Sequence, residues 1–577
     1  MKLTEAIKKN RELKKEIFNL KKQKLIILSN ITLNQSKDIL EYKLNSNKIY
    51  SEISYGDYDN IINDSLTIKD ELPIIFFELS NLVEGFCFEI ELYDDKKVQV
   101  FEDKVVETLD LIFENLSKSK HVLFNKFSHS AFTNEIYTQT KFELFVSKMN
   151  NYLFSNIPKN FSIIDIDKCI SNISVKSAIN YRNFWSYKSL YTSDFFNQYS
   201  NAILPVLNSL SGLTKKCIVV DCDNTLWKGI IGEDGLSNLE FKKNQSHNGD
   251  LFSYVHYLLK SYHEKGILLC LCSKNNEEDV IEFFDKNKST LTLKQEDFIV
   301  KKINWNNKAI NINDIARELN IGLDSIIFLD DSSFEIDLIK NEIPQVSTLQ
   351  VPDNLFQYPY DVLKLNNLLH NFNNTKEDLL RNKMYVNEIK RKEKINNFKN
   401  IDSYIESLQI KMNISINDLE NVERLSQLTK KTNQFNLSTN RYELGEITNL
   451  IKSQTNEIIS IDISDKFGDS GITGLAILNY QNDLAFVDTF LMSCRVLGRK
   501  IEYAFLNELV IRAITIKKCK SLSLNYIESH KNIPIKTFLD YCVQENPDSI
   551  AVNINNYILN NNIITNNNLI STTWKKN

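Results

Sequence analysis

Residues 217–225 read CIVVDCDNT, and this stretch decides the fold that the sequence predicts. It joins the apolar run Ile218–Val220 to two carboxylates, Asp221 and Asp223, which stand two residues apart. A short apolar run of this kind is typical of a strand that is buried in a parallel sheet. Ligands of open α/β sheets bind at the carboxyl ends of such strands. The stretch therefore predicts a strand that ends in a pair of acidic side chains at a binding edge.

Two further apolar runs end in polar side chains in the same way. Ile267–Cys272 precedes Ser273, and Ile326–Leu329 precedes the neighbouring carboxylates Asp330 and Asp331. Together with the first run they predict three strands whose polar ends meet at one edge of a sheet.

The DxDxT pattern of Asp221–Thr225 resembles the signature of the haloacid-dehalogenase-like superfamily. In that signature the first carboxylate, Asp221, attacks phosphorus, and the second, Asp223, moves protons to and from the leaving and entering oxygens. Ser273 is then expected to hydrogen-bond a phosphoryl oxygen, and Lys308 to neutralise charge on the phosphate and the nucleophile. Each residue alone also has a plainer interpretation, as a turn, a surface cation or a helix cap. Their order along the chain favours a joint site.

The cofactor that this pattern predicts is Mg²⁺, because paired carboxylates suit a hard cation. The predicted ligands are Asp221, Asp223, Asp330 and Asp331. Zinc is not expected, since the nine cysteines show no CxxC spacing and the seven histidines no HExxH pattern.

Longer segments resemble the FkbH-like family, whose members carry a catalytic domain of haloacid-dehalogenase subfamily IIIC with a minimal cap. In the middle of the chain the likeness is carried by residues 221–235 (DCDNTLWKGIIGEDG), 268–275 (LLCLCSKN), 303–308 (INWNNK) and 328–335 (FLDDSSFE). Towards the C-terminus it is carried by residues 428–442 (LTKKTNQFNLSTNRY), 465–475 (DKFGDSGITGL), 490–502 (FLMSCRVLGRKIE) and 526–538. Residues 27–32 and 56–59 are more weakly similar to the family's N-terminal α/β domain. The chain departs from the common form at Lys228, Ser332 and Ser333, so the substrate is left open.

The resemblance implies a reaction on an acyl phosphate. Characterised members take the glyceryl group of 1,3-bisphosphoglycerate, release phosphate and pass the acyl group to the phosphopantetheine thiol of an acyl carrier protein. The implied function is a Mg²⁺-dependent dephosphorylation with transfer of a glyceryl or related acyl group to such a carrier, in a secondary-metabolite or surface-polysaccharide pathway. The alternative is a phosphatase fused to an N-acyltransferase that acts on a sugar or another small molecule.

The C-terminal region of the family is similar to acyltransferases of the GNAT-like fold. Here Arg495, Gly498 and Arg499 precede an expected helix at Ile501, as the loop of an acyl-CoA site would, and N–H groups at a helix start suit a pyrophosphate. Lys500 replaces the final small residue of that loop. We interpret the region as a degenerate acyltransferase fold that binds a pantetheine arm or serves as an acceptor platform. An active N-acetyltransferase and a purely structural domain are the alternatives.

Two cysteines are candidates to hold an acyl group. Cys222 lies between the two carboxylates, although strand alternation would point its thiol away from them and into the core. Cys494 precedes Arg495 and a helix, a setting that favours the thiolate. Packing of both cysteines in cores is the third interpretation, and Cys222 is the hypothesis carried forward. For Trp227, a core aromatic and a cover over the substrate are equal interpretations.

Composition and charge are those of an ordinary globular chain. The 577 residues include 69 Lys and Arg against 74 Asp and Glu, and the net charge of -5 argues against a nucleic-acid partner. No run of 18 apolar residues occurs, and the charged opening sequence lacks the apolar core of a signal peptide. We therefore expect a cytoplasmic protein that does not enter a membrane.

The predicted architecture is α/β and multidomain. We expect an N-terminal α/β domain with a leading helix (1–200), a Rossmann-like catalytic domain with a minimal cap (201–372), a connecting helix (373–400) and a GNAT-like α+β domain (401–577). The Asn-rich end is expected to be a tail that buries little. The expected partners are a phosphorylated small molecule and an acyl carrier protein or acyl-CoA.

Overall fold

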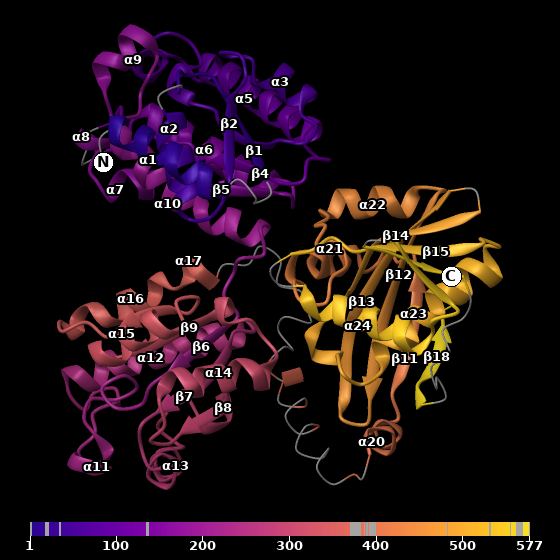
Figure 1. Cartoon of the computed structure of the whole chain (residues 1–577). Coiled ribbons are helices and arrows are strands. Elements are labelled where there is room, and N and C mark those ends of the chain that lie inside the picture. Colours follow the sequence, from indigo (N-terminus) through magenta and orange to yellow (C-terminus); the bar gives the residue numbers. More distant parts are fainter. Residues whose placement is uncertain are drawn as a thin grey trace. The chain divides into compact units, whose positions relative to one another are not determined.

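The computed structural model describes residues 3–17, 22–33, 36–133, 138–369, 382, 384–385, 387, 391, 398, 400–481, 483–529, 532–553, 555–560 and 569–575. They belong to two compact units, one of residues 1–208 with 443–446 and one of residues 209–442 with 447–577 (Figure 1). The units contain two parallel five-stranded sheets and one mixed eight-stranded sheet. The predicted α/β class with several domains is confirmed, whereas the four domain boundaries stay predictions.

The first unit is built on a parallel sheet of order β2-β1-β3-β4-β5. Its strands are β1 (Gln23–Ser29), β2 (Ser51–Tyr55), β3 (Leu72–Phe76), β4 (Val122–Asn125) and β5 (Phe161–Ile164). Its helices are α1 (Leu3–Glu16), α2 (Lys37–Ser46), α3 (Ile61–Thr67), α4 (Phe86–Glu89), α5 (Asp95–Asn115), α6 (Lys141–Asn156), α7 (Ile166–Ser171), α8 (Val175–Ala178), α9 (Tyr181–Tyr187) and α10 (Ser193–Leu210). The leading helix α1 ends at Glu16, and β1 begins at Gln23.

The first sheet of the second unit has the order β10-β9-β6-β7-β8, so β6 lies at its centre. Its strands are β6 (Cys217–Val220), β7 (Leu268–Ser273), β8 (Phe298–Ile303), β9 (Ile326–Asp330) and β10 (Ser347–Gln350). The helices that accompany it are α11 (Ile231–Asp234), α12 (His247–Glu264), α13 (Glu277–Lys286), α14 (Lys308–Leu319), α15 (Ser333–Glu342), α16 (Tyr358–Lys364) and α17 (Asn366–Leu369). All four residues of β6 are buried, as the apolar run predicted.

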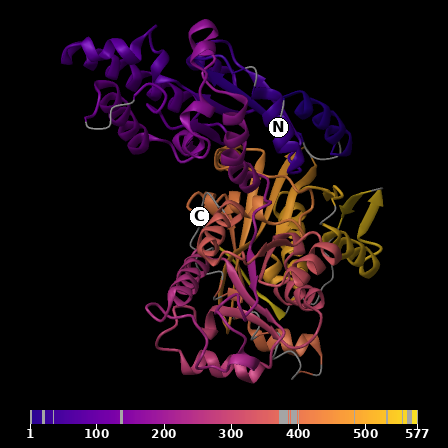
Figure 2. The same ribbon diagram turned by 90° about the vertical axis from the view of Figure 1, so that its left-hand side faces the viewer.

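Alternate side chains of β6 pack on opposite faces of this sheet. Ile218 and Val220 belong to one core cluster with apolar residues of α12 and α16, while Cys217 and Val219 belong to another with apolar residues of α14 and α15. Figures 1 and 2 show helices on both faces of this sheet. Packing against helices on both faces fixes the position and direction of β6 in the sheet. Residues 221–267 add only α11, α12 and two isolated bridges, Asp223 with Trp227 and Lys228 with Glu240, which agrees with a minimal cap.

The second sheet of this unit is mixed and has the order β16-β17-β15-β14-β13-β12-β11-β18. Its strands are β11 (Lys411–Ile416), β12 (Asn456–Asp465), β13 (Gly468–Gln481), β14 (Leu484–Met492), β15 (Ser521–Asn525), β16 (Ile550–Asn553), β17 (Asn556–Leu559) and β18 (Ser571–Trp574). The helices around it are α20 (Ile401–Leu408), α21 (Val422–Lys431), α22 (Leu444–Lys452), α23 (Ile501–Val510) and α24 (Ile533–Glu545), with a π-helix at Ile511–Ile516.

A short stretch of chain, residues 435–437, lies beside β14 where β15 no longer pairs with it. The parallel pairing of β14 and β15 stops at Val487 and Leu524. Farther along, the Leu437 N–H donates to the Phe490 carbonyl (2.9 Å), and the Met492 N–H donates to the Phe435 carbonyl (3.0 Å). We call residues 435–437 the inserted strand.

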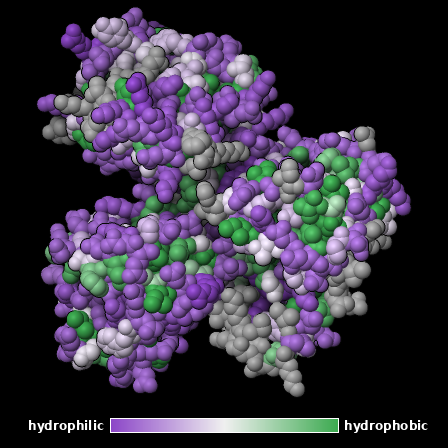
Figure 3. All heavy atoms as spheres, viewed as in Figure 1, coloured by the Kyte–Doolittle hydropathy of each residue, from purple (hydrophilic) through white to green (hydrophobic). Residues whose placement is uncertain are grey.

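Two further predictions concern segments of the second unit. The predicted connecting helix, 373–400, lies largely outside the described residues. The Asn-rich end is more than a tail, because β18 pairs in parallel with β11 and completes the sheet edge. The visible face of the molecule is mostly hydrophilic (Figure 3), and no helix among the described residues has the length and apolarity to cross a bilayer.

Candidate active site

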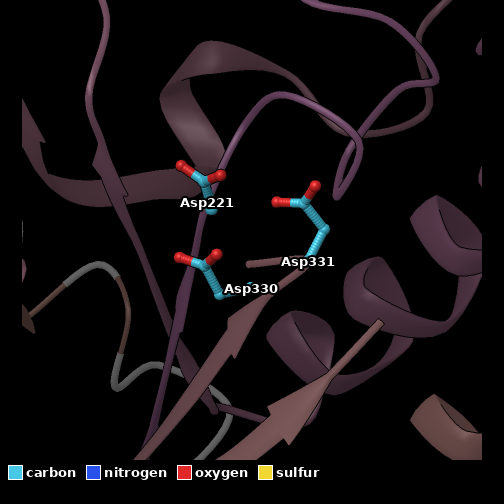
Figure 4. Close-up of side chains that lie close together, drawn as sticks. All are labelled: Asp221, Asp330 and Asp331. Carbon is cyan, nitrogen blue, oxygen red and sulfur yellow. The ribbon is translucent and has the colours of Figure 1, made fainter. Parts of the chain in front are cut away.

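Three carboxylates converge at the carboxyl edge of the β10-β9-β6-β7-β8 sheet. Asp221 follows β6, Asp330 is the last residue of β9, and Asp331 comes next. One oxygen from each lies within 4.8 Å of the others, and Figure 4 shows the three side chains facing a common space. They meet because β6 and β9 are adjacent and parallel, with Val220 beside Leu329.

Lys308 joins this cluster from the start of α14. Its Nζ lies 3.1 Å from Asp221 Oδ1 and 2.6 Å from Asp330 Oδ2, and the side chain is buried. The Asn307 side chain accepts a hydrogen bond from the Ala309 N–H (2.7 Å) and so fixes the helix start. Burial lowers the pKa of Lys308, but the charges of Asp221 and Asp330 outweigh it and raise that pKa above its usual range. Lys308 is therefore a permanent cation in contact with both carboxylates.

One ammonium does not balance three carboxylates. Burial and the charge of Asp221 raise the pKa of Asp330, and the same two causes raise the pKa of Asp331. Asp221 Oδ1 is buried and accepts no hydrogen bond of regular geometry, although Lys308 is near it. Carboxylate oxygens around a common space are the donor set of a hard divalent cation. The residues present thus fit the predicted metal, with Asp221, Asp330 and Asp331 as the side chains that would hold it.

Asp223 does not join the metal-binding group, contrary to its predicted role as a carboxylate ligand. Its Oδ1 accepts hydrogen bonds from the Trp227 indole Nε1–H (2.9 Å) and the Ile231 N–H (3.1 Å), and its Oδ2 accepts one from Asn275 Nδ2 (3.0 Å). The reason is the tight loop after β6. In this loop Asn224 has a φ of 50°, and Trp227 forms an isolated bridge with Asp223. Burial is the main cause that raises the pKa of Asp223. A carboxyl group of raised pKa suits proton transfer, which is its other predicted role.

Ser273 stands where the sequence placed it, and a neighbour that was not predicted supports it. Ser273 ends β7 and is buried, and Asn275 Nδ2 donates to its Oγ (3.1 Å). Asn275 thus contacts both Ser273 and Asp223. Its signal in the sequence was a polar residue three positions after the predicted strand end, within a segment already quoted for its family likeness.

Trp227 is a core aromatic, so the first of its two interpretations holds. The indole is fully buried and its ring centroid lies 4.2 Å from that of Phe283. It does not cover a substrate.

The structure does not support Cys222 as the residue that holds an acyl group. Its side chain is fully buried in the apolar cluster that contains Ile218 and Val220, because the strand alternation continues past the end of β6. Burial, and then the charge of Asp221, raises the pKa of the thiol well above its usual range. The reactive thiolate is therefore disfavoured there. The rival Cys494 is partly exposed and lies outside this sheet.

The residues of the predicted acyl-CoA loop are bonded to other residues of the protein. Arg499 forms an ion pair with Asp465 (3.2 Å), and Arg495 donates to Met384 Sδ (2.8 Å) and to Ser493 Oγ (3.3 Å). The Gly498 N–H donates to Glu502 Oε1 (3.3 Å). Helix α23 begins at Ile501 as predicted, but the cofactor-binding roles of Arg495, Gly498 and Arg499 lose their support. Met384 and Asp465 are distant in sequence from the loop, so the pattern alone did not reveal these two partners.

Comparisons with known proteins gave likenesses among solved structures only. No family model matches the chain, and no curated protein matches it. The N-terminal part of protein BF1531 from Bacteroides fragilis, containing a phosphatase domain and complexed with Mg, is 23% identical. That match covers 65% of this chain and 100% of the other, with a TM-score of 0.55, and it shows that the two share a fold.

A second likeness is slight. A mutant of the spermidine N-acetyltransferase SpeG from Vibrio cholerae is 16% identical, with a TM-score of 0.18. That match covers 23% of this chain and 78% of the other, and it is too slight to show a shared fold.

Proposed function

We propose that this chain is a Mg²⁺-dependent phosphoryl-transfer enzyme of the haloacid-dehalogenase type. The observation that carries the proposal is the convergence of Asp221, Asp330 and Asp331 with the buried cation Lys308 at the carboxyl edge of a parallel sheet. The shared fold with a solved protein that contains a phosphatase domain and Mg supports it.

In the proposed reaction the residues of the site divide the steps among them. Asp221 attacks the phosphorus of a bound phosphoryl group, and Asp223 gives a proton to the oxygen that leaves. Ser273 and Lys308 hold the non-bridging oxygens. Asp330 and Asp331, with Asp221, would bind Mg²⁺, which when bound supplies Lewis-acid stabilisation of negative charge. Water then cleaves the aspartyl phosphate, and Asp223 takes the proton back.

We further propose that the natural substrate is an acyl phosphate and that the acyl group passes to the pantetheine thiol of a carrier protein. The sequence resemblance to the FkbH-like family supports this finer assignment. In that reaction the thiol sulfur replaces Asp221 as the nucleophile and attacks the acyl carbon. The bond between that carbon and the phosphate oxygen breaks, and phosphate leaves into the site described above. The thiol proton passes through Asp223 to the phosphate, so the products are a thioester and monohydrogen phosphate.

The alternative, a phosphatase fused to an N-acyltransferase, has less support. It requires a site for an acyl-CoA pyrophosphate, and the predicted loop residues Arg495, Gly498 and Arg499 are engaged with Met384, Ser493, Glu502 and Asp465.

The experiment that tests the proposed function is the Asp221→Asn substitution. We expect no phosphate release from acetyl phosphate or an aryl phosphate, because an amide is a poor nucleophile and carries no charge for a cation. The loss should exceed about a thousandfold, while circular dichroism and thermal unfolding stay those of a folded protein. A folded Asp221→Asn protein with full activity contradicts the assignment.

A further inference from the structure

Three hydrogen bonds fix the carboxylate of Asp223 in one orientation. Both oxygens accept from buried donors, Oδ1 from the Trp227 indole and the Ile231 N–H, and Oδ2 from Asn275. A carboxylate only accepts, so the atom of the Asn275 amide that faces it is the nitrogen. A carboxyl group with both oxygens bonded cannot turn about its last torsion without breaking a hydrogen bond.

The two side-chain donors are themselves immobile. Trp227 is fully buried, with Phe283 and Phe284 packed against it. Asn275 is 6% exposed, and its Nδ2 also donates to Ser273 Oγ. The amide of Asn275 therefore links the predicted proton donor to the predicted phosphoryl-binding hydroxyl and sets the distance between them.

We propose that Trp227 and Asn275 are positioning residues, which hold the Asp223 carboxyl group in line with the leaving oxygen and at a fixed separation from Ser273. This inference rests on the proposed function. Neither residue contacts phosphorus, and neither belongs to the nucleophile or the carboxylate cluster. Their task is geometric, since a proton donor that is displaced by about 1 Å can lose two orders of magnitude in rate.

A positioned proton donor matters in proportion to the basicity of the leaving oxygen. An alkyl phosphate such as glycerol phosphate releases a strongly basic alkoxide and needs the proton, whereas 4-nitrophenyl phosphate releases a weakly basic phenolate and needs it far less. Loss of the positioning residues should therefore separate the two substrates. General damage to the site would slow both alike.

The test compares Trp227→Phe and Asn275→Ala with the wild-type chain on these two substrates. The first variant keeps a ring against Phe283 and removes the donor, and the second removes the amide. We expect kcat for the alkyl phosphate to fall about tenfold to a hundredfold. We expect kcat for the aryl phosphate to fall by less than about threefold, with KM changed by less than about twofold for both.

Matched controls make the same kinds of substitution at residues that do not contact Asp223. Asn276→Ala removes the neighbouring amide, which is exposed, and Trp185→Phe makes the same ring change at an exposed site in the first unit. Both controls should keep wild-type rates on both substrates. Thermal unfolding of all four variants shows whether a lost rate is a lost fold.

The outcomes are distinguishable. Two results overturn this inference and leave the proposed function standing, provided that the wild-type chain is active. In the first, Trp227→Phe and Asn275→Ala lose kcat equally on both substrates. In the second, neither variant loses kcat on either substrate. A wild-type chain that releases phosphate from neither probe nor from acetyl phosphate overturns the proposed function, and the inference falls with it.

Discussion

Asp330 is fully buried between a cation and a second carboxylate, which makes it the most sensitive member of the metal-binding group. It accepts from Lys308 Nζ at 2.6 Å and lies on the strand next to Asp221. An asparagine there keeps the size of the side chain and removes its charge.

We expect Asp330→Asn to raise the Mg²⁺ concentration for half-maximal activity by about tenfold or more, with a smaller effect on kcat at saturating metal. A metal titration of phosphate release measures this. The matched control is Asp337→Asn on α15, whose carboxylate is exposed and pairs only with Lys340 among the interactions that the structure records. A titration curve identical to that of the wild type contradicts the ligand role.

Residues at strand ends were the easiest to predict from the sequence. Asp221, Ser273, Asp330 and Asp331 each lie at or just after the end of a buried strand, and adjacent parallel strands place such positions together. Asn275 and the indole of Trp227 could not be assigned, because their partner depends on a loop that turns at Asn224 with a positive φ. The orientation of Cys222 was predictable from alternation, and the objection based on it was correct.

At the scale of an element, the end of β3 carries a buried acid. Glu78 follows that strand, its main chain is held by Asn30 through two hydrogen bonds of 2.7 and 2.9 Å, and the Tyr191 hydroxyl donates to Oε1. Burial raises the pKa of Glu78 from 4.5 to about 7. The folded protein therefore favours the neutral acid, and ionisation destabilises it.

The sign of the pH effect follows from that raised pKa. Below pH 4.5 the acid is neutral in both the folded and the unfolded chain, and above about pH 7 it is charged in both. The stabilisation by the neutral acid is thus complete at low pH and lost as the pH rises to about 7. The difference between the two pKa values corresponds to about 3 kcal/mol.

We expect Glu78→Gln to stabilise the first unit by about 3 kcal/mol at pH 8 and to have no effect near pH 4. Denaturant unfolding at the two pH values measures the difference. Glu107→Gln on α5, where the side chain is exposed, is the control and should change neither value. Equal stabilisation at both pH values would show that burial of charge is not the cause.

Elements were predictable where burial gives a continuous apolar pattern, and less so elsewhere. The strands β6, β7 and β9 are such runs, and their predicted extents differ from the observed ones by one residue at one end for β6 and β9 and at both ends for β7. By contrast, β18 reads STTW and gains its place only by pairing with β11 at a sheet edge. Pairing of that kind depends on a distant segment and leaves little pattern in the strand itself.

At the scale of the whole molecule, alternating strands and helices predicted the two parallel sheets, and the chain's net charge predicted nothing that bears on its substrate. The mixed sheet lies in the region for which the family resemblance implied an α+β domain. What its loop does was not predictable, since Arg499 and Asp465 meet only through the fold. The proposed acyl transfer is therefore tested by direct measurement of its two products.

We expect the chain to release phosphate from an acyl phosphate faster when a pantetheinylated carrier protein is present, and to form carrier thioester in an amount equal to the phosphate released. Mass spectrometry of the carrier and of phosphate made in ¹⁸O-labelled water measures both. Attack of the thiol on the acyl carbon leaves the phosphate unlabelled, whereas attack of Asp221 on phosphorus followed by hydrolysis labels it. A carrier without its pantetheine arm is the control, and labelled phosphate with no thioester would reduce the function to that of a phosphatase.

The inserted strand has a consequence for how the chain is made. Residues 435–437 bond to β14, and the Leu437 carbonyl also accepts from the Ile527 N–H (3.0 Å). During synthesis on the ribosome, Phe435 and Leu437 emerge long before β14 and longer still before Ile527. Their side chains, which are buried in the folded protein, stay without β14 and Ile527 until both have been synthesised. Contacts so far apart in sequence also form slowly. A pause in translation between residues 437 and 527 would lengthen the time for which this apolar segment is open to chaperones.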